Sequence, residues 1–292
     1  MDNPLFYVPN GVVYPPFKNG KYLEEFFYEQ NKNINIYDVN GKLYIPALWT
    51  NFQIEGWFGE KRDEMQFSLD KFVMENPCDS GYFTLVQHDN GPQLRLPDNT
   101  TIYGACSGNV PIPLIYEDKN NTLKNIPKKT FAEKNILCSF VGRITHDLRQ
   151  NMVNQLNKNG FVINYTHNWS DNVSQHEQQS FIETTVNSKF ALAPRGDGRS
   201  SFRFFEIMLL GTIPVYIYND IEWLPYKDIL DYSKFAISIH ESQIHTLETI
   251  LTNINEIQYN EMIEEYNKIK YMFELDYISD YIKKFSTGTI HW

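Results

Sequence analysis

Residues 190–217 of the chain read FALAPRGDGRSSFRFFEIMLLGTIPVYI. The apolar segments at its two ends, 190–194 and 213–217, predict buried strands, and the spacing of apolar residues over 202–210 predicts a helix that ends at Gly211. A polar turn with two glycines separates the first strand from the helix. Strand, tight turn and helix in this order are typical of a parallel α/β sheet, so this stretch predicts the fold class and marks a polar site.

The turn after residue 194 has the composition of an anion site. Gly196 and Gly198 allow the backbone to approach a ligand closely, and Ser200 or Ser201 begins a helix whose free N–H groups attract negative charge. Glu206 lies one turn further along among apolar residues, where a carboxylate needs a role or a partner. It either accepts hydrogen bonds from two ribose hydroxyls or pairs with Arg203 three residues earlier.

The distribution of charge points to a small phosphorylated ligand. The net charge of −10 argues against nucleic acid or an anionic membrane as partner. Of the seven arginines, five lie between positions 143 and 203, namely Arg143, Arg149, Arg195, Arg199 and Arg203. Guanidinium binds phosphate through two parallel hydrogen bonds, so this clustering favours a phosphate ligand over the alternative, a set of surface ion pairs.

Composition also bounds the compartment. The 292-residue chain opens with no secretion signal, and it has no run near the ~18 apolar residues that a membrane span needs. Three cysteines without metal-ligand spacing favour a reducing compartment. We therefore expect a cytoplasmic protein with no membrane span, no metal site and no cofactor.

The pattern of elements divides the chain near residue 130. An N-terminal α/β domain is predicted for residues 1–130, with a helix over 60–75, and the polar stretch 118–135 is the predicted linker. In the second domain, 131–292, strands at 136–142, 161–166, 189–194 and 212–218 alternate with helices at 147–158, 176–187 and 201–211, and helical spacing continues beyond 238. This alternation predicts a parallel sheet with right-handed crossovers.

These residues resemble a known family. The segment 188–239 is closely similar to the core of the exostosin-like glycosyltransferases, family 47, and SFVGRITHDLRQ (139–150) resembles the block before it. YIPALWTNFQ (44–53) and YFTLVQHDNG (82–91) look like acceptor-side strands of small bacterial or viral members. The resemblance implies two Rossmann-like domains facing across a cleft, the GT-B type, with the acceptor side in 1–130 and a nucleotide-sugar donor on 131–292.

The resemblance also implies roles for single residues. The donor-binding set is Arg143, Arg149, Arg195, Ser200, Ser201, Arg203 and Glu206. Within it, Arg143, Arg195, Arg203 and the two serines would hold the diphosphate, and Glu206 the ribose. Trp49, Trp57, Phe58, Tyr103 and Trp169 are large enough to stack on a sugar or a base, although core packing is the commoner role for each.

Two absent patterns bear on the mechanism. The chain has no Asp-x-Asp pair for a metal, so arginines and a helix end are expected to neutralise the leaving group. No second glutamate lies eight residues from Glu206, which favours an inverting reaction over a retaining one. Inversion requires a base, for which we expect Asp89, then His88 and then Glu55. Alternatively, His88 and Asp89 only cap a turn before Gly91.

The expected function is therefore metal-independent, inverting transfer of a sugar from a UDP-linked donor to a glycan hydroxyl. One alternative is a fucosyltransferase that uses a GDP-sugar, although the Glu-Asn-Ser turn of that family is absent. A second alternative is a non-catalytic module that binds a nucleotide sugar or a glycan.

Overall fold

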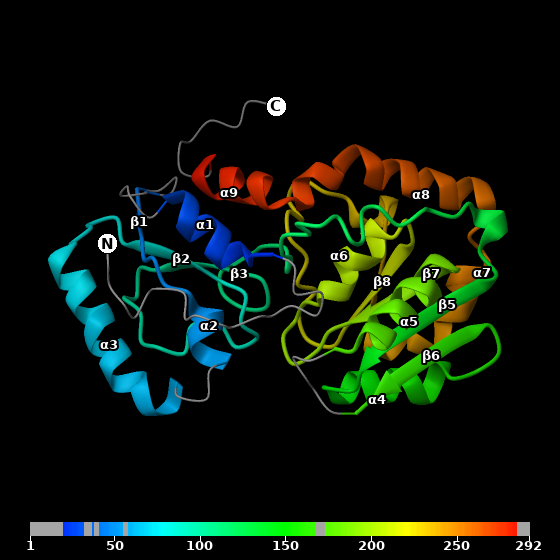
Figure 1. Cartoon of the computed structure of the whole chain (residues 1–292), viewed down its shortest axis with the longest axis horizontal. Helices are drawn as coiled ribbons and strands as arrows, with labels where there is room; N and C mark the ends of the chain where they lie inside the picture. Colours follow the sequence, from blue (N-terminus) through cyan, green and yellow to red (C-terminus); the bar gives the residue numbers. More distant parts are fainter. Residues whose placement is uncertain (1–19, 32–36, 38–40, 55–57, 168–172, 285–292) are drawn as a thin grey trace. The chain divides into compact units, whose positions relative to one another are not determined.

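The computed structural model describes residues 20–31, 37, 41–54, 58–167 and 173–284. Its contacts divide the chain into two compact units, and each is described here by itself. The described part of the first unit consists of residues 21–117 and 274–284, and that of the second mainly of residues 118–273 (Figure 1). These bounds differ from the predicted division at 130/131, because 118–130 belong with the second unit and the last helix belongs with the first.

The first unit contains a parallel sheet with its strands in sequential order. The strands are β1 (Leu43–Tyr44), β2 (Tyr82–Val86), β3 (Thr101–Gly104) and β4 (Val110–Pro111), and the helices are α1 (Leu23–Asn31), α2 (Trp49–Ile54), α3 (Phe58–Glu75) and α9 (Leu275–Lys284). The helix predicted over 60–75 is confirmed as α3. Trp49, Phe58 and Tyr103 are buried, so these three aromatic side chains serve the core.

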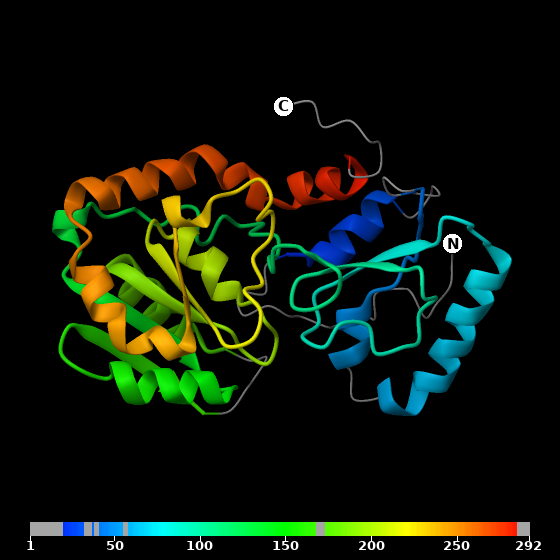
Figure 2. The same ribbon diagram turned by 180° about the vertical axis from the view of Figure 1, so that it is seen from behind.

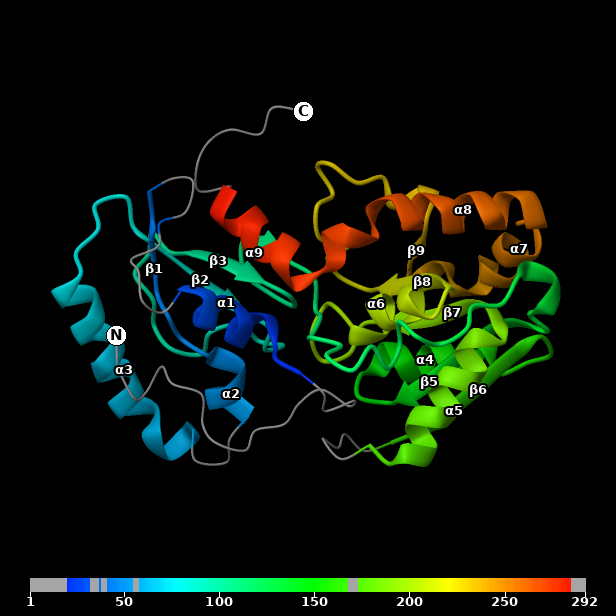
Figure 3. The same ribbon diagram turned by 45° about the horizontal axis from the view of Figure 1, so that its top comes forward.

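The C-terminal helix α9 packs against α1 (Figure 3). Ile278 and Ile282 of α9 are fully buried, and the Ser279 hydroxyl donates a 2.7 Å hydrogen bond to the Gln30 side chain of α1. The apolar face of α9 is thus buried in the first unit, which is why the helix does not follow the predicted domain boundary.

A buried carboxylate joins three segments of the first unit. Glu24 of α1 is fully buried and accepts hydrogen bonds from the Thr50 hydroxyl (2.5 Å), the Thr50 N–H (3.0 Å) and the Gln87 N–H (2.6 Å). Burial raises the pKa of Glu24 to about 7, against the opposing effect of these hydrogen bonds. Glu24 therefore fixes the backbone just before His88 at the end of β2.

The second unit is a five-stranded parallel sheet in the order β6-β5-β7-β8-β9. Its strands are β5 (Ile136–Arg143), β6 (Phe161–Thr166), β7 (Ser188–Pro194), β8 (Ile213–Tyr218) and β9 (Ile237–His240). The first four confirm the predicted strands. Numbered within the unit, the order is 2-1-3-4-5, the flavodoxin-like variant of the doubly wound fold rather than the classic Rossmann order.

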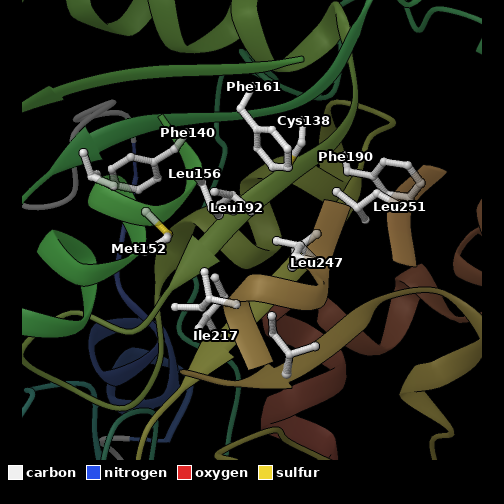
Figure 4. Close-up of a cluster of buried hydrophobic side chains, with 14 of the residues drawn as sticks. Cys138, Phe140, Met152, Leu156, Phe161, Phe190, Leu192, Ile217, Leu247 and Leu251 are labelled. Carbon is white, nitrogen blue, oxygen red and sulfur yellow. The ribbon is translucent and has the colours of Figure 1, made fainter. Parts of the chain in front are cut away.

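Helices cover both faces of this sheet. They are α4 (Asp147–Leu156), α5 (Gln175–Val186), α6 (Phe202–Leu209), α7 (Leu247–Thr252) and α8 (Glu256–Ile269), the first three as predicted. α5 lies in front of the strands in Figure 1, and α7 lies in front in the reverse view of Figure 2. Figure 4 shows Met152 of α4 and Leu247 of α7 among side chains of the strands, including Phe140 and Leu192. Successive residues of a strand point to opposite faces of the sheet, so Tyr216 of β8, next to Ile217 in the chain, packs against Phe204 of α6 on the other face.

The helix of the opening stretch has the predicted ends. Ser201 is the N-cap of α6, and its side chain accepts a hydrogen bond from the Arg203 N–H. Gly211 follows the helix with φ of 71°, a conformation that favours glycine. None of the helices in the described ranges is long and apolar enough to cross a bilayer.

Candidate functional site

The polar residues of the second unit gather where its strands end. In a doubly wound sheet, ligands bind beyond the carboxyl ends of the strands at the point where the strand order reverses. That switch point lies between β5 and β7. Arg143 is the last residue of β5, and Arg195 follows directly after β7. The topology thus brings together two arginines that are far apart in the sequence.

Arg195 is held within its own turn. Its side chain is 11% exposed, Nε donates to Gly196 O (3.2 Å), and Nη2 donates to Asp197 O (2.8 Å). Nη1 meets Asn219 Oδ1 at 3.1 Å and Asp220 Oδ1 at 3.0 Å. A guanidinium held by four oxygens is pre-ordered, so it loses little conformational freedom when it binds an anion.

Asp220 connects the two arginines of the turn. Its second oxygen, Oδ2, accepts a 2.7 Å hydrogen bond from Nε of Arg199, whose guanidinium lies 5.5 Å from the ring of Trp223. Burial acts to raise the pKa of Asp220, but the Arg199 hydrogen bond and the charges of Arg195 and Arg199 outweigh it and hold that pKa below its usual value. Asp220 is therefore an anion already bound between two cationic side chains.

The beginning of α6 supplies two serines and an ion pair. Ser200 and Ser201 are both buried. Arg203 pairs with Glu206, whose side chain is only 2% exposed, and the Arg203 guanidinium lies 3.8 Å from the centre of the Phe181 ring. The sequence left open whether Glu206 has a partner or a ligand, and the structure shows the partner. Its role toward a ribose stays a prediction.

The two arginines contributed by β5 and α4 have different surroundings. Arg143 Nη2 lies 3.4 Å from Glu177 Oε1, and its side chain is 18% exposed. Arg149 donates from its guanidinium to main-chain carbonyl oxygens of residues 143, 194 and 195. Arg149 thus belongs to the framework of this edge, whereas the sequence had grouped it with the ligand contacts.

The candidate bases of the first unit lie directly beyond β2. His88 Nδ1 accepts a hydrogen bond from Asn90 N–H (3.3 Å), and Gly91 N–H donates to His88 O (3.0 Å), so the residues do form a turn. Burial lowers the pKa of His88, and the Asp89 charge offsets this only in part. An occupied Nδ1 assigns the proton of the neutral ring to Nε2. This tautomer makes His88 a hydrogen-bond donor at Nε2, and the role of Asp89 or His88 as the base stays a prediction.

Other predicted residues lie outside the described part of the chain, namely Glu55, Trp57 and Trp169. Sequence reasoning missed Asn219 and Asp220, although polar residues directly after an apolar strand, as in IYND, are the signal that identified Arg195. It also missed His240 at the end of β9, whose Nε2 lies 3.2 Å from Asn219 O. Among the described residues, no group of three or more His, Cys, Asp or Glu side chains is placed to hold a metal ion.

Comparison with known proteins identifies relatives of this chain. The model of the exostosin GT47 domain matches residues 99–254. A probable glycosyltransferase of Arabidopsis thaliana is 24% identical over 234 residues, which is 74% of this chain and 43% of the relative. A probable glucuronosyltransferase of Oryza sativa subsp. japonica is 33% identical over 91 residues, 31% of this chain and 22% of the relative.

The chain therefore spans less than half the length of these two curated relatives. Both are plant proteins, and a bacterial or viral type of member stays a prediction. Among solved structures, TarM matches with a TM-score of 0.38 and 10% identity over 76% of this chain and 57% of that chain, a similarity too low to support an argument.

Proposed function

Because the chain belongs to the exostosin GT47 domain family, we propose that it is a glycosyltransferase and that its second unit binds the nucleotide-sugar donor. The relatives' names support sugar transfer in general. The observation that carries the donor assignment is the placement of Arg143 and Arg195 at the ends of β5 and β7, on the two sides of the switch point. We call Arg143, Arg195, Ser200, Ser201, Arg203 and Glu206 the donor site.

A nucleoside diphosphate suits the donor site for three reasons. Guanidinium groups give strong, charge-assisted hydrogen bonds to phosphate oxygens. The N-terminus of α6 adds the positive end of a helix dipole, and Ser200 lies buried beside the N-cap. These groups also favour the leaving diphosphate over the intact donor, because negative charge grows on it during transfer. We infer a UDP-linked donor and a reaction without metal.

For the acceptor, we propose a glycan hydroxyl that is deprotonated by Asp89 in an inverting displacement. The hydroxyl oxygen attacks the anomeric carbon, the bond to the diphosphate breaks, and the carboxylate of Asp89 takes the hydroxyl proton. The Glu24 network supports this assignment, because it fixes Gln87, two residues before Asp89. In the neutral tautomer with the proton on Nε2, His88 would orient an acceptor oxygen by donating a hydrogen bond.

Thermal unfolding with a panel of UDP- and GDP-sugars tests the donor assignment. A donor at ~100 times its dissociation constant is expected to add ~2.7 kcal/mol of stability to the wild-type chain. Arg195→Ala is expected to lose this gain, whereas Arg95→Ala, an 80% exposed arginine of the first unit, keeps it. Stabilisation by GDP-sugars alone would overturn the UDP assignment. Release of sugar from the bound donor without acceptor separates an enzyme from a binding module.

A further inference from the structure

The side chain of Arg149 joins the ends of two strands. From α4, its Nη1 donates to Arg143 O of β5 (2.8 Å), Nη2 donates to Pro194 O of β7 (3.2 Å), and Nε donates to Arg195 O just beyond β7 (2.9 Å). All three acceptors are main-chain oxygens, and two of them belong to the arginines of the donor site. The guanidinium donates from three separate nitrogens, whereas a lysine at this position would have to reach the same three oxygens from a single nitrogen.

The strand pairing shows why such a link is needed. β5 and β7 are paired from Ile136, which lies opposite Ser188, to Ser139, which lies opposite Ala191. Beyond that, β5 continues beside β6 as far as Arg143, and β7 continues beside β8 as far as Pro194. The two strands thus part before they reach the switch point, and the ladder no longer sets the distance between their ends. The guanidinium of Arg149 spans this gap.

Gly196 gives independent evidence that the turn is fitted to Arg149. A Cβ atom at position 196 would lie 3.0 Å from Nη2 of Arg149 and 3.3 Å from Thr145 Oγ1. Both contacts are shorter than ordinary van der Waals distance. Glycine at this position therefore lets the turn that carries Arg195 close directly on the guanidinium.

We propose that Arg149 is a positioning residue, which fixes the ends of β5 and β7 at the separation at which Arg143 and Arg195 bind one diphosphate together. This inference rests on the proposed function and changes the role of Arg149 from ligand contact to support. Donor binding then depends on the shape of the Arg149 side chain, because its charge alone does not hold three carbonyl groups.

Calorimetry of UDP binding tests the proposal in two variants, one that keeps the positive charge of residue 149 and one that removes it. Arg149→Lys and Arg149→Met are both expected to weaken UDP binding by about tenfold or more, since neither side chain has three nitrogens to bond the three carbonyl oxygens. The matched control is Lys134→Met. Lys134 is also buried and donates to three oxygens, of Val186, Ser188 and Thr212. These bonds lie at the beginning of β7, whereas the donor site lies at its end. This control is expected to lose stability and to bind UDP within twofold of wild type.

A double-mutant cycle with Gly196→Ala measures the coupling between positions 149 and 196 in UDP binding, which general destabilisation would not produce. The Cβ of alanine should weaken UDP binding in the wild-type background and have little further effect beside Arg149→Met, because the group that it displaces is gone. If the losses of UDP affinity in the two single variants were fully additive, or if Arg149→Lys bound UDP with wild-type affinity, the positioning role would be overturned. The proposed function would be unaffected by either result. If the wild-type chain bound neither UDP nor GDP, the proposed function would fall, and this inference with it.

Discussion

Arg195 and Asp220 form an ion pair at 3.0 Å, and the same carboxylate accepts a hydrogen bond from Arg199 at 2.7 Å. The pair joins the turn after β7 to the residues after β8, two neighbouring strands of the sheet. A carboxylate between two guanidinium groups occupies the kind of place that a phosphate would take. This relationship leads to two opposite predictions, one for each partner.

Removing the cation should impair turnover. Arg195→Ala is expected to lower kcat by roughly 100-fold or more, because a charge-assisted contact that strengthens as the diphosphate leaves is lost. Steady-state kinetics on a variant with wild-type circular dichroism measure this, with Arg95→Ala as the control. Near-normal turnover of Arg195→Ala would contradict the diphosphate assignment.

Removing the anion should strengthen binding. In Asp220→Asn, Arg195 keeps its hydrogen bonds to Gly196, Asp197 and Asn219, but the negative charge that competes with a ligand is gone. UDP affinity is expected to rise about threefold to tenfold, and more at low salt than at high salt. Calorimetry at two salt concentrations measures the change, and the exposed Asp228→Asn serves as control. Weaker binding by Asp220→Asn would show that Asp220 chiefly organises the arginines.

Removing the proposed base should impair sugar transfer without weakening UDP binding. Asp89→Asn keeps the shape of the side chain and removes its basicity, so sugar transfer should fall by roughly a hundred- to ten-thousand-fold while UDP affinity is retained. The exposed Asp98→Asn in the same unit is the control. Normal transfer by Asp89→Asn would reduce Asp89 to a turn residue, and a parallel loss of UDP affinity would contradict the assignment of the donor to the second unit.

Glu24 predicts a pH-dependent stability. Burial raises its pKa from 4.5 to about 7 in the folded chain, so the folded state binds the proton more tightly than the unfolded state does. Protonated Glu24 therefore contributes up to about 3 kcal/mol to the free energy of unfolding. This contribution is fully present below pH 4.5 and is lost as pH rises through about 7. Urea unfolding at several pH values should show a flatter profile for Glu24→Gln than for wild type or for Glu29→Gln, an exposed position of α1. A slope in Glu24→Gln equal to that of wild type would refute the assignment.

The reaction is also expected to proceed without a divalent cation. If arginines and the α6 N-terminus neutralise the leaving group, transfer should persist in excess chelator. Assays before and after chelation, and after addition of Mn²⁺, measure this. A loss that Mn²⁺ restores would reveal a cation bound with the donor.

Local chemistry in the sequence was enough to predict most elements and part of the donor site. Apolar runs and caps are short-range signals, so β5 to β8 and the helices α4 to α6 were predicted close to their observed bounds. The polar turn at 195–199 and the Ser201 cap follow from residues that are neighbours in the chain. Arg143 could be identified in the same way, as the polar end of an apolar strand.

Only the tertiary structure decided which distant residues meet. Strand order is set by pairing between segments far apart in the chain, so no local pattern shows that β5 lies beside β7, or that Asp220 reaches Arg195 and Arg199. The same holds for Arg149, because no local pattern shows that its guanidinium bonds main-chain oxygens of residues 143, 194 and 195. The sequence predicted the last helix as part of the second domain, and the burial of Ile278 and Ile282 places α9 with the first unit. Sequence thus determined which groups are available, and long-range packing determined their partners.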